Sequence, residues 1–178
     1  MASIMSKVGE IVPSDLKWKY RVDGEWVTRT AEDLFLGKKV IVFSLPGAFT
    51  PTCSNNQLPG FEAKYDDFRA LGLDQIYCAS VNDAFVMNAW FADQGITKVQ
   101  HIPDGNVELT HWTEMSVNKA NLGLGCRSWR YVMYIDNMVI EQIWEEEGHS
   151  DNCGEDPYEI TTPESIYDRM VPIMEAGG

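Results

Sequence analysis

An apolar run of four residues, followed directly by a Pro-Gly turn and a helical pattern, constrains this chain more than any other stretch. Residues 40–43 (Val-Ile-Val-Phe) are β-branched or aromatic and uncharged, which predicts a buried strand. Pro59 lies inside the helical pattern that follows this strand, where it removes one hydrogen bond and should kink the helix. Apolar residues at spacings of three and four predict that this helix begins near Thr52; they are Leu58, Phe61, Tyr65, Phe68 and Leu71.

Cys53 falls in the first turn of the predicted helix. Backbone N–H groups have no intrahelical partner there, and the helix dipole is positive. Such a position favours a thiolate over a thiol, which is the reactive form of cysteine. A buried structural cysteine would fit the same place, and the position in the helix does not decide between the two interpretations.

The pattern Pro46-x-x-x-Thr50-x-x-Cys53 resembles the active-site motif of the peroxiredoxins. The fuller string PGAFTPTCS, with QLPGF at 57–61, resembles the Prx5 (type II) subfamily of the AhpC/TSA thiol peroxidases. Two further blocks agree and follow in the expected order, SVNDAFVMNAW at 80–90 and RSWRY at 127–131. The resemblance runs from about Val8 to Met170. It implies a thioredoxin-like fold, with a mixed central sheet flanked by helices.

The resemblance also implies a reaction and a set of catalytic residues. A thiol-dependent peroxidase reduces hydrogen peroxide and small alkyl hydroperoxides, and its peroxidatic cysteine, here Cys53, becomes a sulfenic acid. The hydroxyl group of Thr50 is able to accept a hydrogen bond from the peroxide and to donate one to the sulfur. Pro46 has no N–H and can shield the sulfur. The family pattern supplies a cation at Arg130, and no metal, haem or flavin is required.

Strand alternation supports the placement of Arg130. Residues 129, 131, 133 and 135 should share one face of a strand, which leaves Arg130 on the opposite face. Arginine suits the role because it stays protonated and offers several donors in a fixed fork. Arg127 competes for this role, although we expect it to be a surface charge.

The sulfenic acid must be resolved by a second thiol, and the chain offers candidates. Cys153 stands at a place similar to that of the resolving cysteine of animal Prx5 enzymes, which implies an intramolecular disulfide with thioredoxin as reductant. The sequence around it differs, however, and acidic neighbours would slow its attack. The alternative is a one-cysteine enzyme reduced by glutathione and a glutaredoxin. Cys126, beside Arg127, is a further candidate.

Composition narrows the possible partners. The formal net charge is −13, so nucleic acid and anionic membrane surfaces are not expected to bind. The acidic runs 145–147 and 151–156 are expected to be solvated surface. No apolar stretch has the length of about 18 residues that a membrane span needs. Residues 1–10 lack the basic start and apolar core of a signal peptide, so we expect a cytoplasmic protein.

Cysteine and histidine spacing gives no sign of a metal site. The four cysteines form no C-x-x-C pair, which argues against a thioredoxin-type dithiol and a zinc knuckle. The three histidines are scattered along the chain. Cys78 lies in a predicted buried strand at 75–81, where core packing explains it.

The remaining elements predict one domain over residues 1–178. Asp23-Gly24 should turn an N-terminal hairpin, and Thr30 with Asp33 resembles a capping box. Further helices are expected at 84–94, 108–117 and 162–174, with Asp83 as the cap of the first. Short strands are expected at 99–102, 129–135 and 138–144, and irregular loops at 121–125 and 148–157. The resemblance implies a homodimer, for which Phe49, Trp90 and Trp112 could serve an interface or the core.

Two other functions remain open on sequence alone. A redox sensor or chaperone-like protein would use oxidation of the same Cys53 to change partners. A glutathione-dependent transferase or oxidoreductase is disfavoured, because Cys53-Ser54-Asn55-Asn56 is not a C-x-x-C. Turnover separates the first alternative from a peroxidase, since a sensor reacts once and an enzyme cycles.

Overall fold

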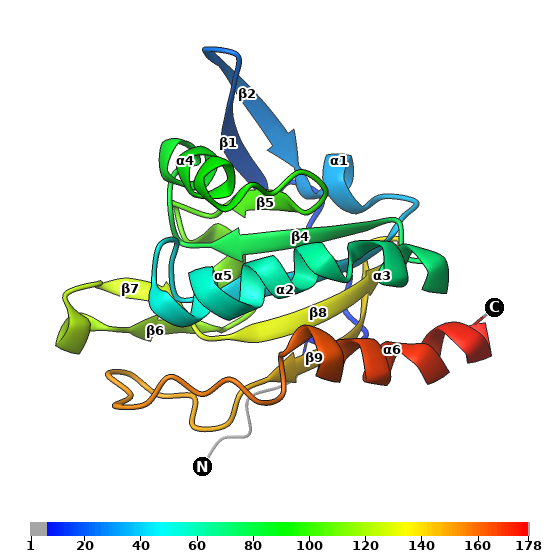
Figure 1. Ribbon diagram of the computed structural model, residues 1–178. Coiled ribbons are helices and arrows are strands. Elements are labelled where there is room, and N and C mark those ends of the chain that lie inside the picture. Colours follow the sequence, from blue (N-terminus) through cyan, green and yellow to red (C-terminus); the bar gives the residue numbers. More distant parts are fainter. Residues whose placement is uncertain (1–6, 178) are drawn as a thin grey trace.

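A five-stranded mixed sheet forms the centre of the molecule in the computed structural model, which describes residues 7–177 (Figure 1). Its strand order is β5-β4-β3-β8-β9. The first three of these strands are parallel, whereas β8 and β9 run antiparallel to their neighbours. Their bounds are β3 (Lys39–Leu45), β4 (Gln75–Ser80), β5 (Gln100–Pro103), β8 (Tyr131–Asp136) and β9 (Val139–Glu145). The predicted mixed sheet is confirmed.

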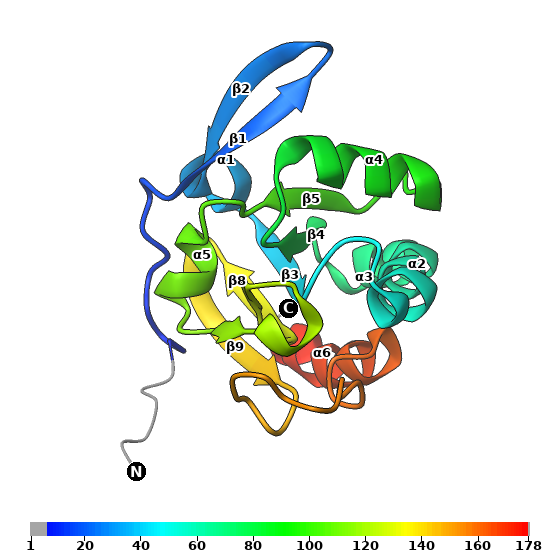
Figure 2. The ribbon, with the colours of Figure 1, turned by 90° about the vertical axis from the view of Figure 1, so that its left-hand side faces the viewer.

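Helices cover both faces of this sheet (Figure 2). One face carries α2 (Leu58–Ala63), α3 (Tyr65–Leu71), α4 (Ala84–Gln94) and α6 (Pro163–Gly177). The other face carries α1 (Ala31–Phe35) and α5 (Glu108–Trp112). Side chains of β8 alternate between the two cores, with Met133 in one and Val132 in the other. The sheet therefore separates two hydrophobic cores, and Cys53 belongs to the core under α2 and α6.

The N-terminal hairpin follows the turn chemistry of its sequence. β1 (Lys17–Val22) and β2 (Glu25–Thr30) pair antiparallel as a separate two-stranded sheet. Asp23 and Gly24 both have positive φ, 49° and 79°, as a two-residue hairpin turn of the mirror-image type requires. The capping box at Thr30 and Asp33 is present, and Asp83 caps α4.

The predicted helix at 108–117 is wrong over its second half. α5 ends at Trp112, where the Thr113 hydroxyl donates to the Leu109 carbonyl at 3.0 Å and Glu114 has a φ of 61°. The chain then forms β6 (Ser116–Asn118), which pairs with β7 (Cys126–Ser128). The predicted loop between them includes one 3₁₀ turn, η2 (Ala120–Leu122). A left-handed residue that is not glycine gives little sequence signal, so the end of the helix was not predicted.

Within residues 7–177, no helix combines the length and apolar character needed to cross a bilayer. The same part of the chain contains no cluster of three or more His, Cys, Asp or Glu arranged to hold a metal ion. Residues 1–6, on which the cytoplasmic prediction partly depends, lie outside the described residues.

Candidate active site

Cys53 lies near the start of a helix that is locally wound as a π turn. The helical residues run from Pro51 to Ala63, and the π turn, η1, spans Cys53–Gln57. The N–H of Leu58 donates to the Cys53 carbonyl, one residue further back than in an α-helix. Pro59 follows directly after this turn and has no N–H to donate, and the helix is distorted here as a widened turn. Pro51 is the first helical residue, where a missing N–H costs no hydrogen bond.

The loop before the helix is a tight turn that holds Thr50 in place. Phe49 has a φ of 63°, in the left-handed region. The Thr50 hydroxyl donates to the Gly47 carbonyl at 2.7 Å, and the Thr50 carbonyl accepts from the Ser54 N–H at 2.9 Å. The hydroxyl proton therefore points to Gly47, where we had predicted that it could reach the sulfur. The lone pairs of the Thr50 oxygen stay available to accept a hydrogen bond from a ligand.

Two side chains from distant segments fix this loop. Asn82 accepts from the Ala48 N–H at 3.0 Å and from the Ser80 hydroxyl at 2.6 Å. Arg127 donates to the carbonyl of Pro46 at 3.3 Å and to that of Leu124 at 3.1 Å. It is half-buried and bound to backbone, so our expectation of a surface charge at Arg127 is wrong.

Arg127 also explains the glycine after Pro46. A Cβ atom at Gly47 would lie 2.5 Å from the Arg127 Nη1, which no normal packing allows. Any side chain at this position would displace the arginine from the Pro46 carbonyl.

Arg130 contacts the sulfur of Cys53. Its Nη1 lies 3.4 Å from the Cys53 Sγ and also donates to the Gln57 Oε1. Cys53 is fully buried and Arg130 is only 2% exposed. Burial acts to lower the pKa of Arg130, but the interactions of the guanidinium with the Cys53 sulfur and the Asp156 carboxylate outweigh it, so the pKa is raised. The guanidinium is thus a permanent cation beside the sulfur, on the sheet face that strand alternation predicts.

Asp156 completes the surroundings of Arg130, although we had expected this acidic segment to be solvated surface. Its Oδ1 lies 2.6 Å from the Arg130 Nη2. The ring of Tyr158 packs 5.5 Å from the guanidinium carbon. The loop at 148–157 folds back over the site, so Asp156 forms an ion pair with Arg130. The two residues are distant in the chain, and the pattern of charges in the sequence does not show such a contact.

Glu146 is a second departure from the solvated-surface expectation. It is buried, and its carboxylate accepts from the backbone N–H groups of residues 159, 160 and 161 and from the Thr161 hydroxyl. The Glu146 carbonyl accepts from the Trp129 indole at 2.8 Å. Burial acts to raise the pKa of Glu146, but these hydrogen bonds outweigh it and lower the pKa. Glu146 therefore anchors the segment that carries Asp156 and Tyr158.

Gln57 is a site residue that the sequence analysis did not single out. Gln57 is buried on the same side of the helix as Cys53, four positions later in the chain. The sequence signal that could have identified it is a polar residue on the apolar face that carries Leu58 and Phe61. The Nε2 of Gln57 and the Nε of Arg130 are buried with no hydrogen-bond partner among the described residues. Two free donors beside the sulfur suit a ligand with adjacent oxygen atoms.

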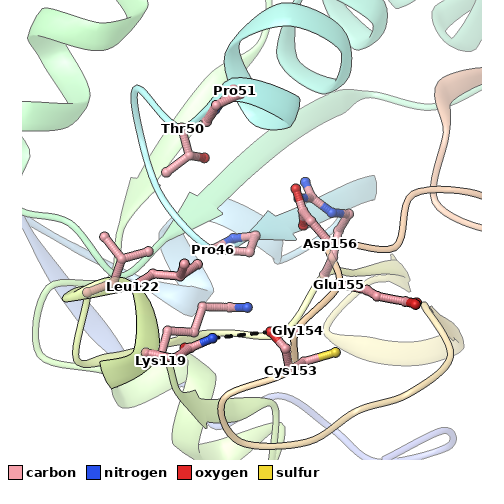
Figure 3. Close-up of a pocket in the computed structure, with 12 residues that line it drawn as sticks. Pro46, Thr50, Pro51, Lys119, Leu122, Cys153, Gly154, Glu155 and Asp156 are labelled. Carbon is pink, nitrogen blue, oxygen red and sulfur yellow. Dashed lines mark hydrogen bonds and ion pairs between the residues drawn. The ribbon is translucent and has the colours of Figure 1, made fainter.

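A pocket of about 410 Å³ opens in front of these groups (Figure 3). Thr50 and Arg130 line it together with Pro46, which connects the pocket to the groups around the sulfur. Pro51, the turn at 119–124 and the loop at 153–156 supply the rest; the residues from the turn and the loop are Lys119, Asn121, Leu122, Leu124, Cys153, Gly154, Glu155 and Asp156. The pocket therefore offers a path to the groups that surround Cys53.

The other cysteines are set apart from Cys53. Cys153 lines the same pocket but is half-buried against the core on the opposite face of the sheet, and its sulfur points away from Thr50 (Figure 3). Cys78 is buried in β4, and burial raises its pKa well above the usual value. Cys126 is exposed in β7. All four thiols are free, so neither Cys153 nor Cys126 is bonded to Cys53.

Comparison with known proteins decides the family. The Redoxin family matches residues 7–156, which is most of the chain. Peroxiredoxin y4vD from Sinorhizobium fredii is 55% identical over 145 residues, covering 82% of this chain and 77% of that protein. The chain belongs to the peroxiredoxin family. It is therefore a thiol-dependent peroxidase, as the resemblance implied.

Other peroxiredoxins agree in sequence and in fold. The hybrid peroxiredoxin hyPrx5 from Haemophilus influenzae is 42% identical over 167 residues, covering 94% of this chain and 67% of that protein. The crystal structure of reduced Prx3 in complex with H₂O₂ from Vibrio vulnificus superposes with a TM-score of 0.82 at 34% identity. That match covers 94% of this chain and 99% of the other. The thioredoxin-like fold of the family is thus confirmed.

Proposed function

We propose that Cys53 is the peroxidatic nucleophile of this peroxiredoxin. The contact between the Arg130 Nη1 and the Cys53 Sγ, at 3.4 Å inside a buried site, carries the proposal. A cation at this distance stabilises a thiolate electrostatically, and it does so strongly where water is excluded.

The reaction follows from the groups around the sulfur. The Cys53 thiolate attacks one oxygen of the hydroperoxide, the S–O bond forms and the O–O bond breaks. The second oxygen leaves as alkoxide or hydroxide and takes up a proton, so Cys–SH and ROOH give Cys–SOH and ROH. Arg130 stabilises the charge that develops on both oxygens, and Thr50 accepts the hydrogen bond of the peroxide O–H. Pro46 shields the sulfenic acid from bulk water.

We propose that an external thiol, rather than Cys153, resolves the sulfenic acid. Cys53 packs in the core of one sheet face and Cys153 against the core of the other, so a bridge requires rearrangement of the loop at 148–157. A small thiol such as glutathione would condense with Cys–SOH to give a mixed disulfide and water. A glutaredoxin or a second thiol then restores Cys53. Thioredoxin is the reductant expected if Cys153 proves to bridge.

We propose in addition that the protein is a cytoplasmic homodimer. Phe49 stays a candidate for the interface, since 53% of it is exposed on the active-site loop. Trp112 is half-buried under Lys7, whose ammonium lies 5.0 Å from its ring. Trp90 is fully buried and donates to the Ser54 hydroxyl at 2.9 Å, so it serves the core. Sedimentation velocity measures the assembly directly.

The decisive experiment treats the reduced protein with one equivalent of hydrogen peroxide and maps the product by mass spectrometry after thiol alkylation. We expect a gain of one oxygen on Cys53 with Cys153 still alkylated, and no turnover by Cys53→Ser. Cys153→Ser is the matched control and should keep the activity. A loss of two hydrogens that maps to a Cys53–Cys153 bridge would overturn the one-cysteine proposal. An unmodified Cys53 would overturn its role as nucleophile. Repeated cycles with added thiol distinguish an enzyme from a single-use sensor.

A further inference from the structure

The pocket in front of Cys53 is lined by a second cation, Lys119, that the proposed peroxidase reaction does not use. Lys119 lines this pocket and is only 4% exposed. Within residues 7–177 its ammonium forms no hydrogen bond and no ion pair with a carboxylate, and it lies over the ring of Trp129, whose centroid is 5.6 Å away. The side chain of Lys119 is packed along its length, while the ammonium is not among the fully buried unpaired atoms of the described residues and is free to meet an acceptor in the pocket.

Lys119 is held rigidly enough to serve as a binding group. Its N–H donates to the Gly125 carbonyl at 2.7 Å, and its carbonyl accepts from Leu122 and Leu124 at 3.0 and 3.1 Å. Figure 3 shows its side chain running into the pocket, with the ammonium between Pro46 and Gly154. A fixed backbone and a packed side chain reduce the entropy that binding would cost.

The acidic groups of the pocket do not neutralise this ammonium. Asp156 is engaged by Arg130 at 2.6 Å. Glu155 is exposed at the rim, and its carboxylate points away from Lys119 (Figure 3). The structure therefore leaves one positive charge inside the pocket for a ligand, in a protein whose net charge of −13 otherwise repels anions.

We propose that Lys119 binds the carboxylate of the hydroperoxide substrate, so that the enzyme prefers hydroperoxides which carry a carboxylate group. This inference rests on the proposed role of Cys53. The inner end of the pocket, at Thr50 and Arg130, takes the –OOH group, and its apolar walls, Pro46, Pro51, Leu122 and Leu124, contact the hydrocarbon between the two ends. A single ammonium beside two acidic residues suits one negative charge rather than a phosphate or a polyanion.

The chemical step is unchanged by this recognition. Cys53 takes the outer oxygen of the hydroperoxide, the O–O bond breaks, and the remaining alkoxide is protonated to an alcohol that keeps its carboxylate. Lys119 contacts a part of the substrate that does not react, and it therefore acts on substrate binding and orientation.

The test compares two substrates that differ only in charge. Cumene hydroperoxide is neutral, and its analogue with a 4-carboxylate has the same reacting group and ring. Stopped-flow fluorescence of the reduced protein, with the product confirmed as oxidised Cys53 by mass, gives the second-order rate constant for each. Lys119→Met keeps the length of the side chain and removes the charge, whereas Lys119→Arg keeps the charge. Lys17→Met, at an exposed lysine, controls for the change in net charge.

We expect the preference of the wild-type protein for the carboxylated hydroperoxide to fall about tenfold in Lys119→Met and to persist in Lys119→Arg and Lys17→Met. The rate with hydrogen peroxide should be unchanged in Lys17→Met, and in the two Lys119 variants any change with hydrogen peroxide should be smaller than the change with the carboxylated hydroperoxide. An equal change with both cumene substrates, or no change with either, would overturn the proposal. Hydrogen peroxide that fails to oxidise Cys53 in the wild-type protein would instead overturn the proposed function.

A carboxylate-bearing thiol is the other ligand with this chemistry. Reduction of the sulfenic acid by 3-mercaptopropionate and by 3-mercapto-1-propanol tests it in the same variants. If Lys119→Met removes a preference in this step and leaves the hydroperoxide step unchanged, the site recognises the reductant and the hydroperoxide assignment is wrong.

Discussion

At the scale of single residues, the guanidinium of Arg130 is the best-connected group of the site. It contacts the Cys53 sulfur, the Gln57 amide oxygen and the Asp156 carboxylate, and Tyr158 packs beside it. A planar fork can meet several acceptors at once, whereas an ammonium is a point charge. The geometry of the site thus depends on arginine and not on positive charge alone.

Replacement of Arg130 by lysine should therefore lower the rate of Cys53 oxidation while leaving a charge in place. We expect the second-order rate constant with hydrogen peroxide to fall about 10²-fold, similar to the loss of one donor that stabilises developing negative charge. Arg127→Lys is the matched comparison, because Arg127 binds only carbonyl groups in the described structure. We expect its loss to stay below about tenfold. A larger loss in Arg127→Lys would reverse the assignment of the two arginines.

Sequence reasoning reached some of these residues and not others. Strand alternation correctly placed Arg130 on the face opposite Trp129, but only the family resemblance linked it to Cys53. Asp156 and Glu146 were missed because an acidic loop normally favours water. Their partners lie 26 and 13 to 15 residues away in the chain, and the loop path that joins them is a property of the folded protein.

At the scale of elements, the segment after β9 is held by one buried carboxylate. Glu146 accepts four hydrogen bonds from residues 159–161, and its own N–H donates to the Arg130 carbonyl at 3.1 Å. This arrangement ties the end of β9 to the start of α6 and carries Asp156 over the site. Local signals that involve neighbouring residues, such as the caps at Thr30 and Asp83, were predicted correctly. The clamp at Glu146 joins separate segments and has no such signal.

Glu146→Gln should loosen this segment. Glutamine keeps one acceptor and places an NH₂ group against backbone donors, so we expect the free energy of unfolding to fall by roughly 2–3 kcal/mol. Hydrogen exchange at residues 159–161 should rise, as measured by mass spectrometry. Glu147→Gln is the control, since Glu147 is exposed one position later. Equal stability of the two variants would show that the carboxylate does not hold the segment.

The lowered pKa of Glu146 sets the direction of its pH dependence. The native carboxyl group titrates below its unfolded counterpart, so its contribution is complete above the unfolded value, near 4.5, and is lost as the pH falls through the folded value. The difference in stability between wild type and Glu146→Gln should therefore shrink on acidification in this range.

At the scale of the whole molecule, the N-terminal hairpin is joined to the central sheet through His101. The His101 ring stacks on Tyr20 of β1 at 5.5 Å, and its Nε2 meets the Asn88 Oδ1 of α4 at 2.8 Å. Asn88 in turn donates to the Arg21 carbonyl of the hairpin at 2.8 Å. The hairpin turn was predictable from its local sequence. The docking of the hairpin was not, since it depends on contacts about 67 to 81 residues apart.

The environment of His101 makes the free energy of unfolding depend on pH below neutrality. Burial, with the nearby charge of Arg29, lowers the pKa of His101 from 6.5 to about 4. The contact with Asn88 places the proton of neutral His101 on Nε2, and its Nδ1 is buried without a partner among the described residues. Above pH 6.5 the histidine is neutral in both states. Between pH 6.5 and about 4 the unfolded state binds the proton first, so the folded state loses stability, with no further loss from this group below pH 4.

His101→Gln should flatten this part of the stability profile. Urea unfolding at pH 7.5 and at pH 5 gives the change in free energy for each protein. We expect the wild type to lose more than the variant on acidification, by on the order of 1–2 kcal/mol, since one pKa unit corresponds to about 1.4 kcal/mol, only the interval between pH 6.5 and 5 contributes, and partial exposure reduces the effect. His111→Gln, at an exposed histidine, should keep the wild-type slope. If the slopes of all three proteins agree, His101 does not couple the docking of the hairpin to pH. If only His101→Gln is flatter, protonation of this one half-buried ring weakens the contact between the hairpin and the sheet.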